Sequence, residues 1–299
     1  MKEISEIINA VFKFDPDDKA VLATVVDVKG SGYRLPGARM LILADGTTFG
    51  TVSGGCLEAD VMERAKKVLA SGSAETFTYD TTDEESLVFS LNMGCHGVVD
   101  IMLEPIGKFS PVIGKMRTAY EDRIANDEFD IPVAVKLFGA GADAVPFVRI
   151  ATELGWQVTV HDHRPAFLTA ERFPTAHLLV HQLPDDELTD LESDDRTAVV
   201  IMTHSYSRDR TILPAVLRSN AFYVGALGPK RRTEQLLGEI DQQFTTEQLE
   251  RLYAPAGLDI GADTPECIAL SIIGEIQSVL AKRSGGNLRN RQGSIYDRK

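Results

Sequence analysis

The chain has 299 residues, a length typical of two domains, and 43% of its residues are hydrophobic while 25% are charged. These values are ordinary for a globular protein and exclude a largely disordered chain, a collagen-like chain and a disulfide scaffold. The 31 Lys and Arg against 44 Asp and Glu give a net charge of −13. This balance argues against nucleic-acid binding and against attachment to an anionic membrane surface, since both need a broad basic face.

The three cysteines, Cys56, Cys95 and Cys267, are too few and too scattered for a disulfide framework. No apolar run is long enough for a signal peptide or for a membrane-spanning helix. We therefore expect a cytoplasmic protein with reduced thiols.

The first part of the chain reads as an α+β pattern. Apolar residues at helical spacing from Ile4 to Phe12 predict an amphipathic helix. An Asp45-Gly46 turn between two apolar runs predicts a hairpin, and a glycine turn precedes a second helical stretch. The expected strands and helix cover Ala20–Val28, Arg39–Ala44, Thr47–Thr51, Leu57–Ala70 (the helix) and Gly97–Leu103.

The second part alternates strands with helix-length segments, which predicts a parallel, doubly wound sheet. A final helix is expected from Thr264, the N-cap, with Pro265 in its first turn, to Lys282. The expected strands cover Val133–Phe138, Gln157–His161, His177–Val180, Thr197–Thr203 and Ala221–Val224.

The predicted fold class is thus α/β, with a C-terminal Rossmann-like doubly wound parallel sheet and an N-terminal α+β domain. The expected boundaries are an N-terminal domain over residues 1–107, a connector over 108–131, a Rossmann-like domain over 132–283 and a flexible tail over 284–299.

Gly139, Gly141 and Ala144 form a glycine turn between an expected strand and an expected helix. Such a turn lets a diphosphate approach the helix N-terminus. Asp162 follows 23 residues after Gly139, about where a Rossmann site places its ribose-binding carboxylate. A bound NAD(P) is therefore possible, although Asp143 puts a negative charge in the first turn of the helix. The alternative is a Rossmann scaffold with no nicotinamide role.

A second glycine turn, Gly225-Ala226-Leu227-Gly228, runs into Pro229 at the first helical position and then into Lys230, Arg231 and Arg232. Cations in the first turn of a helix oppose the helix dipole, so three together predict an anionic ligand. A solvated basic helix start is the alternative. His204 follows an expected strand at the edge of the sheet where open α/β sheets bind ligands, so it is a further candidate.

Gly54, Gly55 and Cys56 lie at the start of the expected helix in the first part. A helix N-terminus stabilises a thiolate, and the glycines let a ligand approach the backbone. Cys95, in Gly94-Cys95-His96-Gly97, carries a weaker version of the same pattern. A buried, inert cysteine is the alternative in each case.

Several segments in this order resemble one family, the XdhC/CoxI xanthine dehydrogenase accessory proteins, over most of residues 20–283. Those in the first part are Gly30-Ser31-Gly32 with Arg34, Pro36-Gly37-Ala38-Arg39-Met40 and Gly50–Glu58. Those in the second part are Phe138–Gly141, Asp162–Pro165, Thr203–Ser205, Tyr223–Gly228 and Gly257–Glu266. The chain departs from the family pattern at His96, Ala142 and Cys267.

The resemblance implies a protein that binds the molybdenum cofactor (molybdopterin), assists its sulfuration and delivers it to a xanthine dehydrogenase-type molybdoenzyme. The sulfur would come from a partner cysteine desulfurase. The glycine–cysteine segments of the family map onto Cys56 and Cys95, and Cys56 is a soft ligand suited to a metal–sulfur centre. We expect a cofactor chaperone without turnover of its own, working as a homodimer.

Two other functions remain open from the sequence. An NAD(P)-dependent oxidoreductase would use the Rossmann turn, but no pair of residues for hydride chemistry is evident. A pure interaction scaffold would leave the Rossmann site empty.

Overall fold

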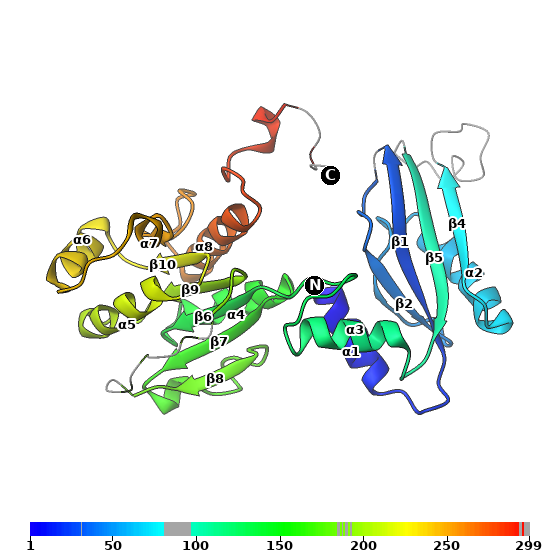
Figure 1. Ribbon diagram of the computed structural model, residues 1–299, viewed down its shortest axis with the longest axis horizontal. Coiled ribbons are helices and arrows are strands. Elements are labelled where there is room, and N and C mark those ends of the chain that lie inside the picture. Colours follow the sequence, from blue (N-terminus) through cyan, green and yellow to red (C-terminus); the bar gives the residue numbers. More distant parts are fainter. Residues whose placement is uncertain are drawn as a thin grey trace. The chain divides into compact units, whose positions relative to one another are not determined.

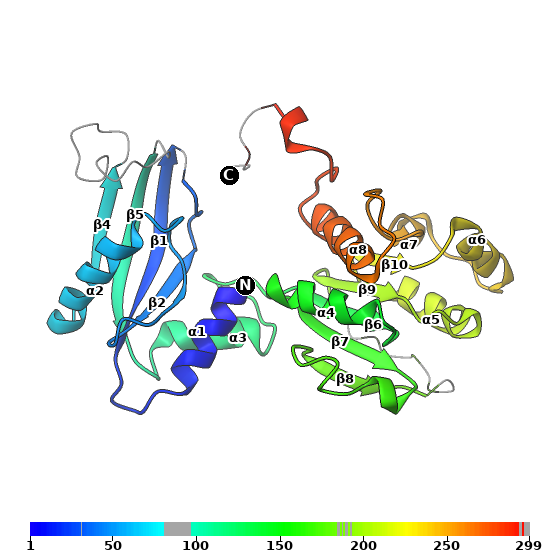
Figure 2. The same cartoon turned by 180° about the vertical axis from the view of Figure 1, so that it is seen from behind.

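The computed structural model describes residues 1–30, 32–80, 97–183 and 193–292, together with the single residues 186, 188, 191 and 295. The chain forms two units, Met1–Pro132 and Val133–Lys299 (Figures 1 and 2). Each unit has its own sheet and its own hydrophobic core.

Unit 1 is built on an antiparallel sheet in the order β3-β2-β1-β5-β4 (Figure 1). Its strands are β1 (Ala20–Gly30), β2 (Arg39–Leu43), β3 (Thr48–Gly50), β4 (Glu75–Asp80) and β5 (Gly97–Ile106). No sequence pattern predicted β4. It is an edge strand in which half of the residues are exposed, and its two apolar residues, Phe77 and Tyr79, give only a short signal.

Helices cover both faces of this sheet. On one face α1 (Lys2–Phe12) and α3 (Pro111–Tyr120) share a core with residues of β1, β2 and β5. On the other face α2 (Glu58–Ser71) packs against the alternate residues of the same strands. The segment expected as a connector, 108–131, contributes α3 and Phe129 to the first of these cores.

Unit 2 is built on a parallel sheet in the order β11-β10-β9-β6-β7-β8. Its strands are β6 (Ala134–Phe138), β7 (Gln157–Asp162), β8 (Leu178–His181), β9 (Thr197–Ile201), β10 (Tyr223–Ala226) and β11 (Leu252–Tyr253). The chain starts in the middle of the sheet, at β6, and moves to the far side when it enters β9. The strand order therefore reverses between β6 and β9, where open α/β sheets bind ligands.

Helices lie on both faces of this sheet, as the predicted doubly wound fold requires. One face carries α4 (Ala144–Glu153) and α8 (Pro265–Leu280), and the other carries α5 (Tyr206–Arg218) and α6 (Lys230–Glu239). Three shorter elements are α7 (Thr246–Glu250), η2 (Pro165–Phe167) and η3 (Leu288–Asn290). Thr264 caps α8 as predicted, because its side chain accepts a hydrogen bond from the N–H of Cys267.

The start of α6 differs from the prediction by one residue. Pro229 has the extended conformation of an N-cap (φ −67°, ψ 147°), and the first helical residue is Lys230. Proline fixes only φ, so ψ is free to take the value that the turn requires.

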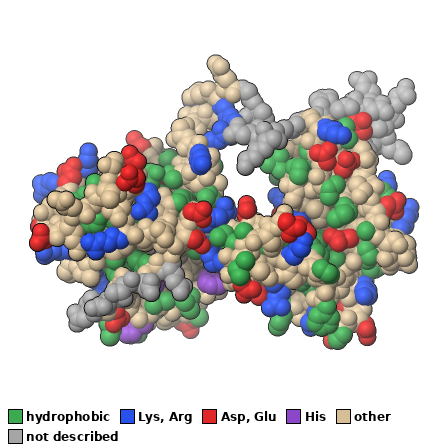
Figure 3. All heavy atoms as spheres, viewed as in Figure 1, with side chains coloured by type: hydrophobic (Ala, Val, Ile, Leu, Met, Phe, Trp, Pro, Cys, Tyr) green, Lys and Arg blue, Asp and Glu red, His purple; other side chains and the backbone are tan. Residues whose placement is uncertain are grey.

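Acidic and basic side chains are interspersed over the face of the molecule that Figure 3 shows. In the part of the chain that the structure describes, no helix is both long enough and apolar enough to span a membrane. Surface charge does not single out a site on this face, so the candidate sites come from turns and cavities.

Candidate functional site

The turn between β3 and α2 is held together by hydrogen bonds to two side chains, Ser53 and Glu58. Ser53 Oγ accepts from the N–H groups of Gly55 and Leu57, both at 3.1 Å, and donates to the Glu58 carboxylate. Glu58 also accepts the N–H of Ser53 at 2.9 Å and the hydroxyl of Thr51 at 2.6 Å. Burial alone would raise the pKa of Glu58, but these hydrogen bonds outweigh burial and lower it.

Cys56 lies in this turn, two residues before the first residue of α2. Its Sγ is 3.6 Å from Ser53 Oγ, and its side chain is half-buried against the core under α2. Gly55 has a φ of 105°, which favours glycine, and the space where a Cβ would project is empty to 4 Å. The thiol and the open backbone of Gly55 are therefore neighbours, as a ligand-binding turn requires.

Tyr33 forms one side of this turn, and no sequence pattern selected it as a site residue. A Cβ on Gly54 would lie 3.3 Å from the Tyr33 ring, yet the ring is 63% exposed. The next residue, Arg34, forms an ion pair with Glu3 of α1. The only sequence signal was its place between Gly32 and Arg34 in a family segment, since contact with Gly54 depends on the fold.

The other predicted cysteine, Cys95, lies outside the described residues. Among the residues that are described, no group of three or more His, Cys, Asp or Glu side chains could hold a metal ion.

The Rossmann turn brings Gly139, Gly141 and His204 together at the reversal point between β6 and β9. Gly139 has a φ of 115°, and a Cβ there would collide with the Met202 carbonyl oxygen and lie 2.9 Å from Thr203 Cα. Gly141 lies against the His204 ring, and His204 Nε2 is 3.0 Å from Asp143 Oδ2. The carboxylate of Asp143 therefore lies at the start of α4, paired with His204.

Asp162 ends β7, as predicted, but its carboxylate is occupied by the chain itself. Oδ1 accepts from the backbone N–H and Nε of Arg164, both at 2.9 Å. Oδ2 accepts from Arg164 Nη2 at 2.8 Å and from the backbone N–H of Ala140 at 2.7 Å. Burial opposes the charged form, but these bonds outweigh burial and hold the pKa of Asp162 well below its usual range.

NAD(P) does not fit this arrangement in the usual Rossmann pose. A carboxylate has about four acceptor positions, and four N–H groups occupy those of Asp162. A ribose hydroxyl would have to displace one of them, and a diphosphate at α4 would meet the Asp143 carboxylate. The sequence could place Asp162 but could not show that Arg164 turns back onto it.

The second glycine turn also has packing reasons for its glycines. A Cβ on Gly225 would lie 2.7 Å from the ring of Tyr223, and one on Gly228 would lie 3.1 Å from Arg232 Cδ. Arg232 turns back to Asp209, with 2.6 Å between Nη2 and Oδ2. Two cations of the cluster, Lys230 and Arg231, are exposed; Lys230 lies 3.9 Å from Glu234.

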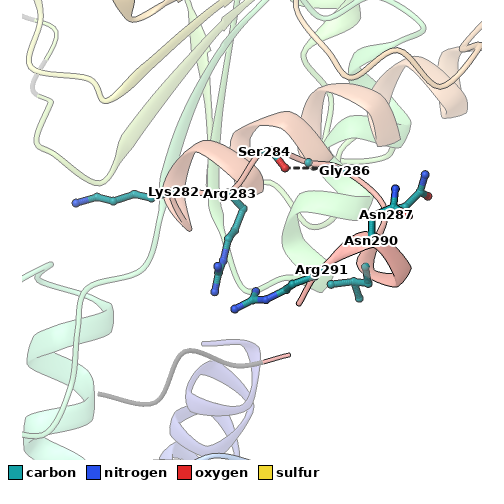
Figure 4. Close-up of a pocket in the computed structure, with 9 residues that line it drawn as sticks. Lys282, Arg283, Ser284, Gly286, Asn287, Asn290 and Arg291 are labelled. Atoms are coloured by element: carbon teal, nitrogen blue, oxygen red, sulfur yellow. Dashed lines mark hydrogen bonds between the residues drawn. The ribbon is translucent and has the colours of Figure 1, made fainter. Parts of the chain in front are cut away.

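A surface cavity of about 550 Å³ lies at the C-terminal segment (Figure 4). Arg283 and Arg291 line it, while Lys282 points away from these two side chains (Figure 4). Its lining residues are nearly all exposed, and no predicted site residue is among them. This cavity is therefore a basic hollow of the surface rather than part of either glycine turn.

Comparison with known proteins agrees with this architecture. The XdhC and CoxI family matches residues 15–80, and the XdhC Rossmann domain matches residues 135–276. A protein of Bacillus subtilis named as a probable subunit of xanthine dehydrogenase is 29% identical, over 88% of this chain and 93% of that protein. The molybdenum cofactor insertion chaperone PaoD of Escherichia coli is 26% identical, over 87% and 83%.

A crystal structure described as a xanthine dehydrogenase from Bacillus halodurans has the same fold, with a TM-score of 0.77 and 28% identity. The likeness covers 95% of this chain and 97% of that one, so it includes both units. The two family matches lie on the two units that carry the cysteine turn and the Rossmann turn. By its sequence and its fold, the chain belongs to the XdhC and CoxI family.

Proposed function

We propose that this protein binds the molybdenum cofactor and inserts it into a xanthine dehydrogenase-type enzyme, without turnover of its own. The observation that carries the proposal is the Cys56 turn. It presents one half-buried thiol beside an open glycine backbone, on a scaffold that Ser53 and Glu58 hold rigid. The names of the relatives from B. subtilis and E. coli support the same role.

Each part of the turn has a task in this proposal. Cys56 Sγ would bind the molybdenum of the cargo, because a thiolate is a soft ligand. Gly54 and Gly55 would let the cofactor approach the backbone, and Cys95 would be a second sulfur ligand. Unit 2 offers a candidate anion site of its own at Gly139, Gly141, His204, Gly225, Gly228, Lys230 and Arg231, whereas the carboxylate of Asp162 is occupied by Arg164 and Ala140.

Two further parts of the proposal concern partners. A cysteine desulfurase would supply the sulfur for the cofactor while this protein holds it, and the protein would act as a homodimer in the cytoplasm. Co-purification with a cysteine desulfurase and light scattering of the purified protein would check these two points.

The test of the main proposal is a comparison of cysteine variants. Purified protein is loaded with molybdenum cofactor, and bound molybdenum and reconstitution of an apo-xanthine dehydrogenase are both measured. Cys56→Ala should lose retention and insertion together, because it removes the sulfur ligand. Cys267→Ala is the matched control, since Cys267 is exposed in the first turn of α8.

Full retention and insertion by the Cys56→Ala variant would refute the thiolate role. NAD and NADP belong in the same binding experiment, because the oxidoreductase alternative requires one of them. We expect neither to bind, since the carboxylate of Asp162 is occupied by Arg164 and Ala140.

A further inference from the structure

The cavity of about 550 Å³ at the C-terminal segment has a lining that suits an anion (Figure 4). The described residues that line it lie between 282 and 291, after the end of α8, and none of them is an Asp or a Glu. Neither the predicted sites nor the proposed function uses any of them. The polar ones are Lys282, Arg283, Ser284, Asn287, Asn290 and Arg291.

The charge of this segment is opposite to that of the whole chain. Residues 282–299 contain six Lys and Arg and one Asp, whereas the chain has a net charge of −13. The helix dipole favours cations at the C-terminal end of α8, which accounts for Lys282 and Arg283. It does not reach Arg291, which follows the last residue of α8 by eleven residues. A local excess of cations in an acidic chain therefore indicates an anionic ligand for this segment.

Packing against α8 fixes the start of the segment. Leu258 fits between two glycines: a Cβ on Gly285 would lie 2.9 Å from Leu258 Cδ2, and a Cβ on Gly274 of α8 would lie 3.1 Å from Leu258 Cδ1. Leu258 belongs to the family segment Gly257–Glu266, to which the proposed function assigns no task. Its packing holds the cavity at the end of α8.

Short-range hydrogen bonds then fold the segment around the cavity. The N–H of Gly286 donates to Ser284 Oγ at 3.3 Å (Figure 4). The N–H of Arg291 donates to the carbonyl oxygen of Leu288 at 3.0 Å, in the turn η3. These bonds bring residues from both ends of a short segment to one cavity.

Two arginines, Arg283 and Arg291, line this cavity, and Figure 4 shows their side chains pointing toward each other. Two cations that converge repel each other unless an anion lies between them. Each guanidinium presents a planar fork of N–H donors, which matches two oxygens of one phosphate or carboxylate. Two such forks on one cavity therefore match an anion with two acidic groups.

We propose that this cavity binds a terminal diphosphate group, with Arg283 on one phosphate and Arg291 on the other. Its volume lies in the range of about 300–1,000 Å³ that is typical of small-molecule sites, so a diphosphate fits. A dicarboxylate would leave more donors unused, because the amides of Asn287 and Asn290 add N–H groups to those of the arginines.

The diphosphate has two possible sources. Inorganic diphosphate and a nucleoside diphosphate present the same terminal oxygens, so either one suits the cavity. The internal diphosphate of NAD is esterified on both sides and carries less negative charge, so it is a poorer match.

This proposal goes beyond the proposed function and is independent of it. The cavity is built by unit 2 alone, whereas the Cys56 turn lies in unit 1. The candidate anion site at the two glycine turns contains none of the residues that line the cavity. A failure of the thiolate role would therefore leave this proposal untouched.

The experiment titrates the full-length protein with inorganic diphosphate, ADP and inorganic phosphate by calorimetry. Low ionic strength is needed, because salt screens exposed charges. Diphosphate should bind saturably, and inorganic phosphate at least about tenfold more weakly, because it reaches only one guanidinium.

Three arginine variants locate the site. Arg283→Gln and Arg291→Gln should each weaken diphosphate binding about tenfold, and the double variant about hundredfold, since each removes a charge-assisted pair. Arg289→Gln is the matched control, because it removes the same charge from an exposed side chain that does not line the cavity. It should bind like the wild type.

A chemical measurement checks the same site without relying on affinity. Phenylglyoxal modifies arginine side chains, and mass spectrometry of the peptides locates the modified residues. Bound diphosphate should protect Arg283 and Arg291 and leave Arg289 reactive.

The outcomes separate the sources of the anion. Binding of ADP at least as tight as that of inorganic diphosphate assigns the cavity to a nucleotide, and binding of inorganic diphosphate alone assigns it to the free ion. No saturable binding of either up to about 1 mM would overturn the proposal.

Two further results would also overturn it. Equal weakening by Arg289→Gln and Arg291→Gln would indicate diffuse attraction to a basic segment. Undiminished binding in the double variant, with the native fluorescence of Trp156 retained, would place the anion elsewhere in the protein.

Discussion

Replacing Asp162 by Asn tests the hydrogen bonds by which its carboxylate holds Arg164 and the Ala140 backbone at the Rossmann turn. The side chain is 3% exposed and accepts four hydrogen bonds, two on each oxygen. Asn keeps the shape but has one acceptor oxygen, and its NH₂ group faces the N–H donors of Ala140 or Arg164. The variant therefore leaves a buried donor without an acceptor and removes the ion pair with Arg164.

The magnitude follows from these two losses. An unsatisfied buried N–H costs about 1–3 kcal/mol. The Arg164 side chain is 39% exposed, so the loss of its ion pair adds only about 0–1 kcal/mol. We expect the free energy of unfolding of unit 2 to fall by about 1–4 kcal/mol, which at a slope of about 2 kcal/mol/M lowers its urea midpoint by about 0.5–2 M.

The chain carries its own reporter for this measurement. Trp156 is the single tryptophan, lies directly before β7 and is 5% exposed. Urea unfolding followed by its fluorescence reports on unit 2. Asp100→Asn in unit 1 is the matched control, since the partner of Asp100 is Thr78 on the neighbouring strand. If Asp162→Asn lowers the free energy of unfolding by less than about 0.5 kcal/mol, these hydrogen bonds do not stabilise unit 2 as we expect.

The same comparison has a defined pH dependence. The pKa of Asp162 in the folded state lies below the value of an unfolded aspartate, about 3.9. The carboxylate therefore contributes its full stability above about pH 4, and this contribution is lost as the pH falls through the folded-state pKa. The difference between wild type and Asp162→Asn should stay constant from about pH 5 to pH 8 and narrow below about pH 4.

Three further predictions concern glycine, capping and buried hydroxyl groups. Gly139→Ala should lower the free energy of unfolding by about 3 kcal/mol or more, because a Cβ there collides with backbone atoms. The control is Gly238→Ala, which should be neutral or slightly stabilising because a Cβ there meets open space. Thermal melts compare the two variants. Ser53→Ala should lower the free energy of unfolding by about 1 kcal/mol, because the turn loses the hydroxyl that accepts from the N–H of Leu57. The loosened turn should also let Cys56 react faster with a thiol reagent. An unchanged reaction rate would count against the turn as a rigid support. Tyr223→Phe should lower the free energy of unfolding of unit 2 by about 1–3 kcal/mol, because the Tyr223 hydroxyl donates to the Glu275 carboxylate at 2.6 Å. An unchanged melting curve, followed by Trp156 fluorescence, would contradict this.

The sequence was most informative where a pattern is local. Apolar runs located most strands to within a few residues, and the alternation of strands with helices predicted the parallel sheet. It was weakest at β4, because this edge strand, half of whose residues are exposed, has only two apolar residues to mark it. Pro229 was misplaced by one residue, since a proline fits both an N-cap and a first helical position.

In the candidate sites, too, the sequence predicted what depends on neighbouring residues and missed what depends on the fold. Gly54, Gly55 and Cys56 stand together in the sequence, so a cysteine turn could be predicted from local spacing alone. The contact of Tyr33 with Gly54 could not, because 21 residues separate them and only the fold of unit 1 brings them together.

Local spacing by itself determined the glycine turns, the N-cap Thr264 of α8 and the position of Asp162 at the end of a strand, because each depends on neighbours a few residues away. Only the tertiary structure decided how the polar groups are shared. It placed Arg164 against Asp162 and Arg232 against Asp209. The reason is physical: a buried charge or hydrogen-bonding group is satisfied by whatever the fold places within about 3 Å, and no local pattern records which residue that is.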